Sequence, residues 1–131
     1  MTGSMESQSS HKFCISRAKE ANFANDQFRD WLTARDLGLS EATNGAYGAQ
    51  VTRAKELGHA TGPHYHEMTF QIIYVLKGWV TLWYEGEGEF TLSKGDFVYH
   101  PPTATHDLRH YSEDVELLEL FAPAHPKTVD V

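Results

Sequence analysis

The sequence has few of the features that mark secreted or membrane proteins. Cys14 is its one cysteine, so no disulfide can form within the chain. No apolar run approaches the roughly 18 residues that a membrane-spanning helix needs, and the N-terminus lacks the basic start and apolar stretch of a secretory signal. We therefore expect a cytoplasmic protein that has no membrane partner.

Positive charge is also scarce. The chain has 11 Lys and Arg against 18 Asp and Glu, which gives a formal net charge of -7. Nucleic acids and anionic membrane surfaces attract clusters of Lys and Arg, and the sequence contains no such cluster. The charge balance disfavours both as partners and favours a small-molecule ligand.

The length of 131 residues suits one domain with a buried core. Residues 1–12 are polar and rich in Ser, so we expect a disordered tail there. Residues 13–131 are expected to form a single domain, because no Gly- or Pro-rich linker divides them. Within it, Phe28 to Leu39 has two interpretations: a short helix capped by Asn25 or Asp26, or a strand with alternating faces.

From residue 46 onwards the sequence is typical of an all-β domain. Short runs rich in β-branched and aromatic residues alternate with turns that contain Gly, Pro and acidic residues. Short strands at this spacing predict a β-sandwich or barrel. The predicted strands are 47–54, 69–76, 79–84, 89–92, 97–100, 105–111 and 115–121.

Three histidines and a glutamine, His64, His66, Gln71 and His106, lie in this β-rich region. His64 and His66 are two residues apart, which puts both imidazoles on one face of a strand. Neutral imidazoles bind Zn, Fe, Ni, Cu or Mn, and an amide oxygen adds a harder donor. We therefore expect one divalent transition metal ion, with Zn, Fe, Ni and Mn as the candidates.

The spacing of these residues resembles the two motifs of the cupin superfamily. The first motif is a glycine, five residues, His-x-His, three or four residues, a glutamate, six residues and a glycine. The second is a glycine, five residues, Pro-x-Gly, two residues, a histidine, three residues and an asparagine. The matching positions are Gly58, His64, His66, Gln71 and Gly78 for the first motif, and Gly95, Pro101, Thr103, His106 and His110 for the second.

This resemblance implies an all-β double-stranded β-helix, a jelly-roll barrel with its core at residues 46–122, preceded by a short irregular or helical segment. It also implies that His64, His66, Gln71 and His106 hold the metal. Gln71 stands where the motif has glutamate, Thr103 replaces a glycine, and His110 replaces the asparagine. The neutral Gln71 leaves the ion a stronger attraction for an anionic ligand.

The set of His-x-His, Gln and His is similar to that of cupins that linearise unsaturated uronates. In those proteins an aspartate, a phenylalanine and an arginine near the last barrel strand serve the substrate, and Glu119, Phe121 and His125 fall on these positions. Two of the three differ, and His125 lacks the permanent forked charge of arginine. This difference argues against the uronate reaction itself.

We predict a metal-dependent enzyme that uses the ion as a Lewis acid on a small, oxygen-rich, anionic substrate, in isomerase, lyase or ring-opening chemistry. Glu119 is the candidate general acid or base, and Phe121, His125 and Tyr99 are candidate substrate-binding residues. The alternatives are an Fe- or Ni-dependent dioxygenase and a non-catalytic binding module. We also expect a homodimer, and we expect His59, His100 and His125 at loops or rims.

Overall fold

The computed structural model describes residues 10–131. The prediction of a disordered tail at residues 1–12 falls, up to residue 9, outside the described part of the chain. Among residues 10–131, no helix is long and apolar enough to cross a membrane.

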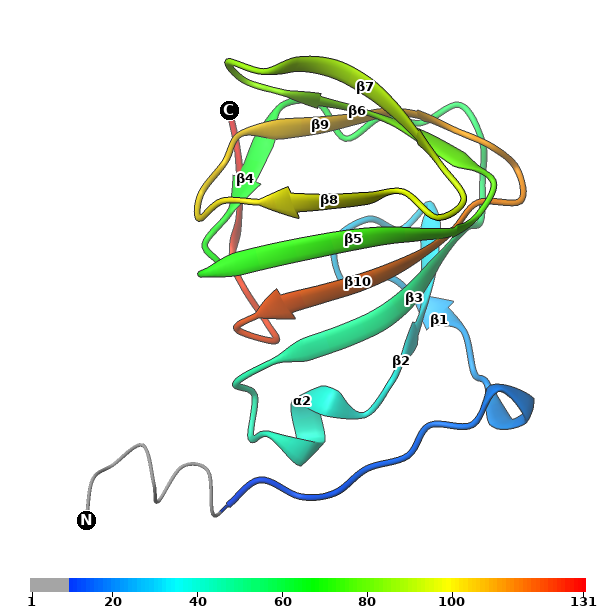
Figure 1. Ribbon diagram of the computed structural model, residues 1–131, viewed down its shortest axis with the longest axis vertical. Helices are drawn as coiled ribbons and strands as arrows, with labels where there is room; N and C mark the ends of the chain where they lie inside the picture. Colours follow the sequence, from blue (N-terminus) through cyan, green and yellow to red (C-terminus); the bar gives the residue numbers. More distant parts are fainter. Residues whose placement is uncertain (1–9) are drawn as a thin grey trace.

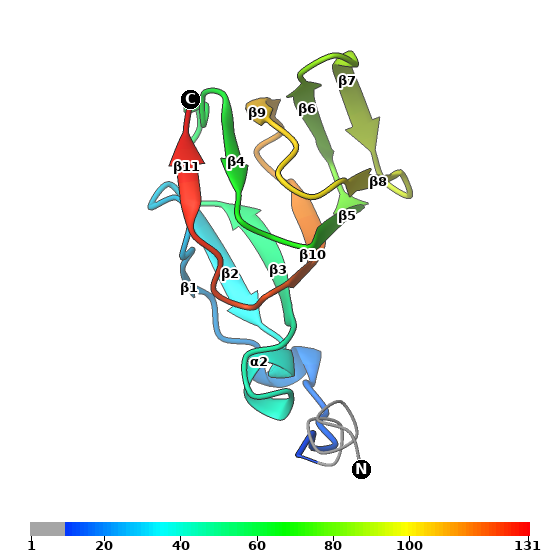
Figure 2. The same ribbon diagram turned by 90° about the vertical axis from the view of Figure 1, so that its left-hand side faces the viewer.

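Two antiparallel sheets face each other and enclose the core, as Figures 1 and 2 show from two sides. One sheet has six strands in the order β1-β2-β3-β10-β5-β8, and the other has five in the order β11-β4-β9-β6-β7. The predicted all-β jelly-roll barrel is confirmed. The strands are β1 (Ala24–Asn25), β2 (Leu32–Asp36), β3 (Gly48–Ala54), β4 (His64–His66), β5 (Phe70–Lys77), β6 (Trp79–Tyr84), β7 (Gly88–Ser93), β8 (Phe97–His100), β9 (His106–Tyr111), β10 (Glu116–Ala122) and β11 (Thr128–Asp130).

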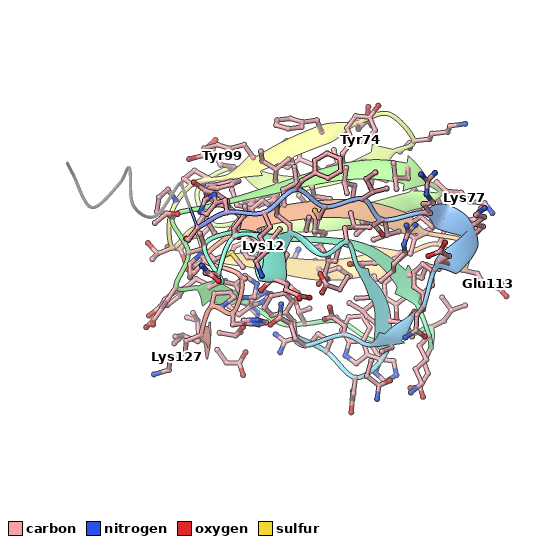
Figure 3. All side chains as sticks on the ribbon, turned by 90° about the horizontal axis from the view of Figure 1, so that it is seen from below. Lys12, Tyr74, Lys77, Tyr99, Glu113 and Lys127 are labelled. Carbon is pink, nitrogen blue, oxygen red and sulfur yellow. The ribbon has the colours of Figure 1, made fainter. Side chains whose placement is uncertain are left out.

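The chain before β3 is more irregular than the barrel. It contains a 3-10 turn, η1 (Ala18–Glu20), and one four-residue helix, α2 (Leu39–Ala42). The region from Phe28 to Leu39 forms a turn and then strand β2, so the short helix capped at residue 25 or 26 was wrong, and the strand alternative is correct for Leu32–Asp36. Residues 11–20 pass beneath the barrel in Figure 1 and cross the outside of the six-stranded sheet in Figure 3.

Alternation along the strands divides inward from outward side chains. In β10, Leu117, Glu119 and Phe121 are buried, whereas Glu116, Leu118 and Leu120 between them are partly exposed. The apolar cluster occupies one end of the interior, where large side chains from both sheets meet and are removed from water. Its buried members are Trp31, Leu32, Ile73, Val75, Val80, Leu82, Tyr84, Tyr111, Val115 and Leu117.

Four positions of the two motifs, Gly58, Gly78, Gly95 and Thr103, have left-handed backbone. Gly78, the last residue of the first motif, has φ +69°, and a Cβ there would collide with Ser112. Thr103, which replaces a glycine of the second motif, has φ 57°. Such a φ is unfavourable for a β-branched residue, so this loop keeps the conformation of the motif without its usual glycine.

Candidate metal centre

The sheet register brings three histidines together. His64 on β4 lies directly opposite His106 on β9, and His66 follows two residues later on the same face of β4. The ring centroids are 4.3 Å apart for His64 and His106, 4.9 Å for His64 and His66, and 5.3 Å for His66 and His106. One ring nitrogen from each histidine lies within 4.8 Å of the other two, so this cluster is able to hold a metal ion.

Each of the three rings is fixed through its Nδ1 atom. Nδ1 of His64 donates to the carbonyl oxygen of Gly62 at 2.8 Å, and Nδ1 of His106 donates to that of Ala104 at 2.9 Å. Nδ1 of His66 lies 2.8 Å from the hydroxyl of Thr128, its register partner on β11. A carbonyl only accepts hydrogen bonds, so it fixes the Nδ1–H tautomer and leaves Nε2 with a free lone pair.

Burial keeps these imidazoles in the neutral form that ligates metals. Burial, together with the neighbouring histidines, lowers the pKa of His66 to about 3 and that of His106 to about 4. Burial also lowers the pKa of His64, against a hydrogen bond to Gly62 that raises it. Neutral imidazoles offer lone pairs without first losing a proton.

Gln71 lies beside the cluster, near the start of β5, and is buried. Its Nε2 donates to Oε1 of Glu119 at 3.3 Å. Because the amide nitrogen is the donor in this bond, the amide oxygen is the atom of Gln71 that remains available as a ligand. Gln71 lines the same cavity as the three histidines.

Glu119 on β10 is enclosed by polar side chains. Its Oε2 accepts hydrogen bonds from the hydroxyl of Thr52 and, at 3.2 Å, from Nε2 of Gln50, and its Oε1 accepts the bond from Gln71. Burial and the charge of Asp26 raise the pKa of Glu119 to about 7, against these hydrogen bonds, which lower it. This carboxyl group lines the same cavity as the histidines.

His100 belongs to the interior of the barrel, contrary to the expectation that it lies at a loop or rim. It ends β8, lies opposite Gln71 in the register and is buried. Its ring centroid is 4.5 Å from that of His106, and its Nε2 lies 2.6 Å from the hydroxyl of Tyr84. Burial lowers the pKa of His100 well below the usual value. More exposed and more buried side chains alternate along residues 97–100, and this alternation places His100 on the inner face.

The N-terminal region contributes side chains that sequence reasoning missed. Asp26, Phe28 and Arg29, from the turn between β1 and β2, line a cavity of about 50 Å³ together with the three histidines, Gln71 and Glu119. The ring of Phe28 packs against His66 with centroids 4.9 Å apart. Liquid water takes roughly 30 Å³ per molecule, so this cavity has room for a small group beside the histidines.

The other predicted substrate-binding residues lie outside this cavity. Phe121 is buried and packs against Phe28, with ring centroids 5.8 Å apart. His125 bonds to Ser40 and Gln27 at the surface, where it lines a groove with Phe121. Tyr99 points outward from the six-stranded sheet, is 48% exposed, and is labelled in Figure 3.

Comparison with known proteins identifies the fold family. The sequence pattern described as a cupin domain matches residues 56–121. A curated relative, quercetin 2,3-dioxygenase of Bacillus subtilis, is 38% identical over 65 residues, which cover 46% of this chain and 19% of the dioxygenase. The chain thus spans about a fifth of that relative's length.

Two solved structures share the barrel. KdgF from Halomonas sp. has a TM-score of 0.67 at 23% identity, with 85% of this chain and 95% of KdgF covered. The polyketide cyclase RemF from Streptomyces resistomycificus has a TM-score of 0.73 at 18% identity, with 92% of this chain and 86% of RemF covered. At these identities the likeness shows the fold alone.

Proposed function

The chain belongs to the cupin family, and from that premise we propose that it is a metal-dependent enzyme acting on a small, oxygen-rich, anionic substrate. His64, His66 and His106 would hold a divalent transition metal ion, with Gln71 as the fourth protein ligand. A divalent ion held there supplies Lewis-acid polarisation of an oxygen atom of the substrate.

One observation carries this proposal: three buried imidazoles converge, each already hydrogen-bonded at Nδ1, and the carbonyl partners of His64 and His106 leave the Nε2 lone pairs of these two rings free. Histidines that serve only packing need no such common orientation, whereas metal ligands are usually fixed through the second ring nitrogen. Protein carbonyls and a hydroxyl hold the three rings in place, so little reorganisation is needed when the ion binds.

The chain's own residues favour an anionic substrate. Three imidazoles and an amide carry no charge, so they leave the full charge of the ion uncompensated. Arg29 adds a permanent positive charge to the wall of the cavity. A carboxylate, enolate or enediolate would supply the missing negative charge.

We assign to Glu119 the proton-transfer step of this reaction, as the candidate general acid or base. The support is its place in the wall of the histidine cavity and a pKa that burial raises to about 7, close to where a proton-transfer group works best near neutral pH. Its bond to Gln71 also orients the amide oxygen of that residue.

Oxygenase chemistry is the second candidate, and one specific observation favours it. The segment shared with quercetin 2,3-dioxygenase is 38% identical, a higher identity than those of the KdgF and RemF structures. Histidine ligands suit Fe and Ni as well as Zn, so the protein part of the site is compatible with both chemistries.

Metal identity and oxygen demand separate the two candidates. Protein purified without chelators is analysed for Zn, Mn, Fe and Ni by mass spectrometry. It is then loaded with each metal in turn. Each loaded sample is screened against sugar acids and phenolic enediols, with an oxygen electrode to follow oxygen uptake. Turnover of a sugar acid by the Zn- or Mn-loaded protein without oxygen uptake is the expected result. Oxygen uptake matched to substrate loss in the Fe- or Ni-loaded protein would support the dioxygenase instead.

A further inference from the structure

Within residues 10–131, two buried side-chain atoms have no hydrogen-bond partner, and both belong to residues that line cavities beside the histidines. They are Nη2 of Arg29 and Nδ1 of His100. Leaving a buried charged donor without an acceptor is costly, by more than the roughly 1–3 kcal/mol of a neutral group. Nη1 of Arg29 donates to the carbonyl oxygen of Phe28 at 3.4 Å, and the acceptor near Nη2 is Oδ1 of Asp130 at 3.5 Å. These long contacts leave donors of the guanidinium available for an acceptor from outside the chain.

The turn that presents Arg29 is well fixed. Oδ2 of the buried Asp26 accepts the backbone N–H groups of Phe28 and Arg29, each at 2.9 Å, and its Oδ1 accepts a bond from Gln50 at 2.9 Å. The backbone N–H of Asp26 and that of Leu32 close the turn through the carbonyls of Leu32 and Arg29, respectively. Side-chain and backbone bonds thus hold the backbone of the turn that carries Arg29, and Arg29 lines the cavity from this turn.

The carboxylates near Arg29 give it one long ion pair at the surface and no pair inside the cavity. Asp26 is occupied by its own turn and by Gln50, and Glu119 is occupied by Thr52, Gln50 and Gln71. The one ion pair of Arg29 in the described chain joins Nη2 to Asp130 at 3.5 Å, and the Asp130 side chain is 77% exposed. An exposed, long pair of this kind contributes little.

The Arg29 side chain is 19% exposed. Its positive charge lowers the pKa of His64, His66 and His106. A divalent ion on these histidines would therefore lie near a second positive charge. Two neighbouring cations repel each other unless an anion lies between them. A ligand with negative charge placed between the metal ion and Arg29 would offset this repulsion.

We propose that the Arg29 guanidinium binds the carboxylate of the ligand, and so selects small carboxylates that carry a second oxygen atom for the metal. This inference rests on the proposed function, because the second oxygen needs the ion. The forked donors of arginine match the two oxygens of a carboxylate. The cavity beside the histidines is small, with a volume of about 50 Å³, which favours a small ligand.

Calorimetric titration of glycolate and of its neutral analogue glycolamide tests the proposal. Both are titrated into the Zn-loaded wild-type protein and into the variants Arg29→Gln, Arg29→Lys and Arg35→Gln. Arg35 is the matched control, since its guanidinium bonds to Ser16 on the outside of the barrel. Zinc content is measured for each sample, and the metal-free wild type and its Arg29→Gln variant are titrated alongside.

Glycolate is expected to bind the Arg29→Gln protein at least about tenfold more weakly than the wild type, because a charge-assisted pair is lost. Arg29→Lys should fall between them, Arg35→Gln should match the wild type, and glycolamide affinity should not depend on residue 29. If Arg29→Gln does not fold, Arg29→Lys decides the question, with a several-fold loss expected.

The outcomes separate this inference from the proposed function. Unchanged glycolate affinity in Arg29→Gln, or no saturable glycolate binding to the wild type, overturns the role of Arg29, while one equivalent of zinc would leave the metal site standing. Failure to bind zinc, combined with glycolate binding that still depends on Arg29, would reject the metal-dependent function and keep the anion site.

Discussion

The interior of the barrel has two ends that differ in chemistry although the same strands build both. Along β5 the inward side chains change from Gln71 to Ile73 and Val75, and along β10 they change from Glu119 to Leu117. Along β6, Tyr84 beside His100 gives way to Leu82 and Val80. The polar end lies on the left in Figure 1, where β11 runs.

The apolar end of the interior stabilises the fold, whereas the polar end holds the side chains of the candidate site. At the apolar end, burial removes hydrocarbon from water and supplies free energy of folding. At the polar end, burial forces histidines, amides and carboxyl groups into hydrogen bonds or leaves them unpaired. Changes at the apolar end should therefore alter stability, whereas changes at the polar end should alter binding of metal and anion.

The largest effect on stability is expected from Leu117→Ala at the apolar end. Leu117 is 3% exposed, and truncation of such a buried leucine leaves a cavity that costs about 2–5 kcal/mol. Urea unfolding measures this loss, with Leu57→Ala as the control, because Leu57 is 53% exposed and should cost less than about 1 kcal/mol. Loss of metal binding in folded Leu117→Ala protein would show that the two ends are not separable.

A smaller loss is expected from Asp26→Ala, which removes the acceptor of two backbone N–H groups in the Arg29 turn and of the side-chain amide of Gln50 on β3. We expect the free energy of unfolding to fall by about 2–3 kcal/mol, since buried donors lose their partner. Asp36→Ala is the control, because Asp36 is exposed and accepts one bond, from the backbone of Gly38. Equal losses in the two variants would contradict the structural role of Asp26.

Thr128→Val tests the anchoring of His66 at the polar end. The valine keeps the shape of threonine but removes the hydroxyl that bonds Nδ1 of His66. Loss of such an anchor typically weakens metal affinity by about 10- to 100-fold, with little effect on stability. Competition with a chromophoric chelator measures the affinity, and Thr128→Ser should retain it. Equal affinities of the valine and serine variants would show that the hydroxyl does not matter.

The smallest effect is expected at the rim of the polar end, in Thr103→Gly. Glycine adopts the left-handed φ of 57° at this position without the steric penalty of threonine, so the free energy of unfolding should rise by about 0.5–1 kcal/mol. Asn44→Gly is the control, since Asn44 has φ 51° and asparagine tolerates that region. A decrease in the stability of Thr103→Gly would indicate that the hydroxyl or methyl group makes a compensating contact.

The barrel was predictable because its signals are local. Alternating side chains and turn residues predicted seven strands, and β6 and β8 have the predicted bounds. Strand β4 is three residues long, and the His-x-His spacing alone marked it. Motif spacing also selected His64, His66 and His106, because register and spacing are fixed together in a barrel.

The contributions of Arg29 and Phe28 were not predictable in this way. Their turn reaches the histidines through long-range packing, and no local period in the sequence encodes a contact between residue 28 and residue 66. The inward position of His100 was available from alternation along 97–100, although the sequence analysis placed it at a loop or rim. Tyr99 and His125 show the converse, since alignment with a motif does not determine which way a side chain points.

The most direct test of the metal centre is zinc binding to the metal-free protein, measured by equilibrium dialysis and mass spectrometry. A His64→Ala/His106→Ala variant is measured in the same way, with His110→Ala as the control at an exposed site. His110 is exposed on β9. We predict one tightly bound equivalent in the wild type and in His110→Ala, and none in the double variant, with circular dichroism showing the fold in each. Equal zinc binding by the wild type and the double variant, or no zinc binding by the wild type, would contradict a metal centre at these three histidines.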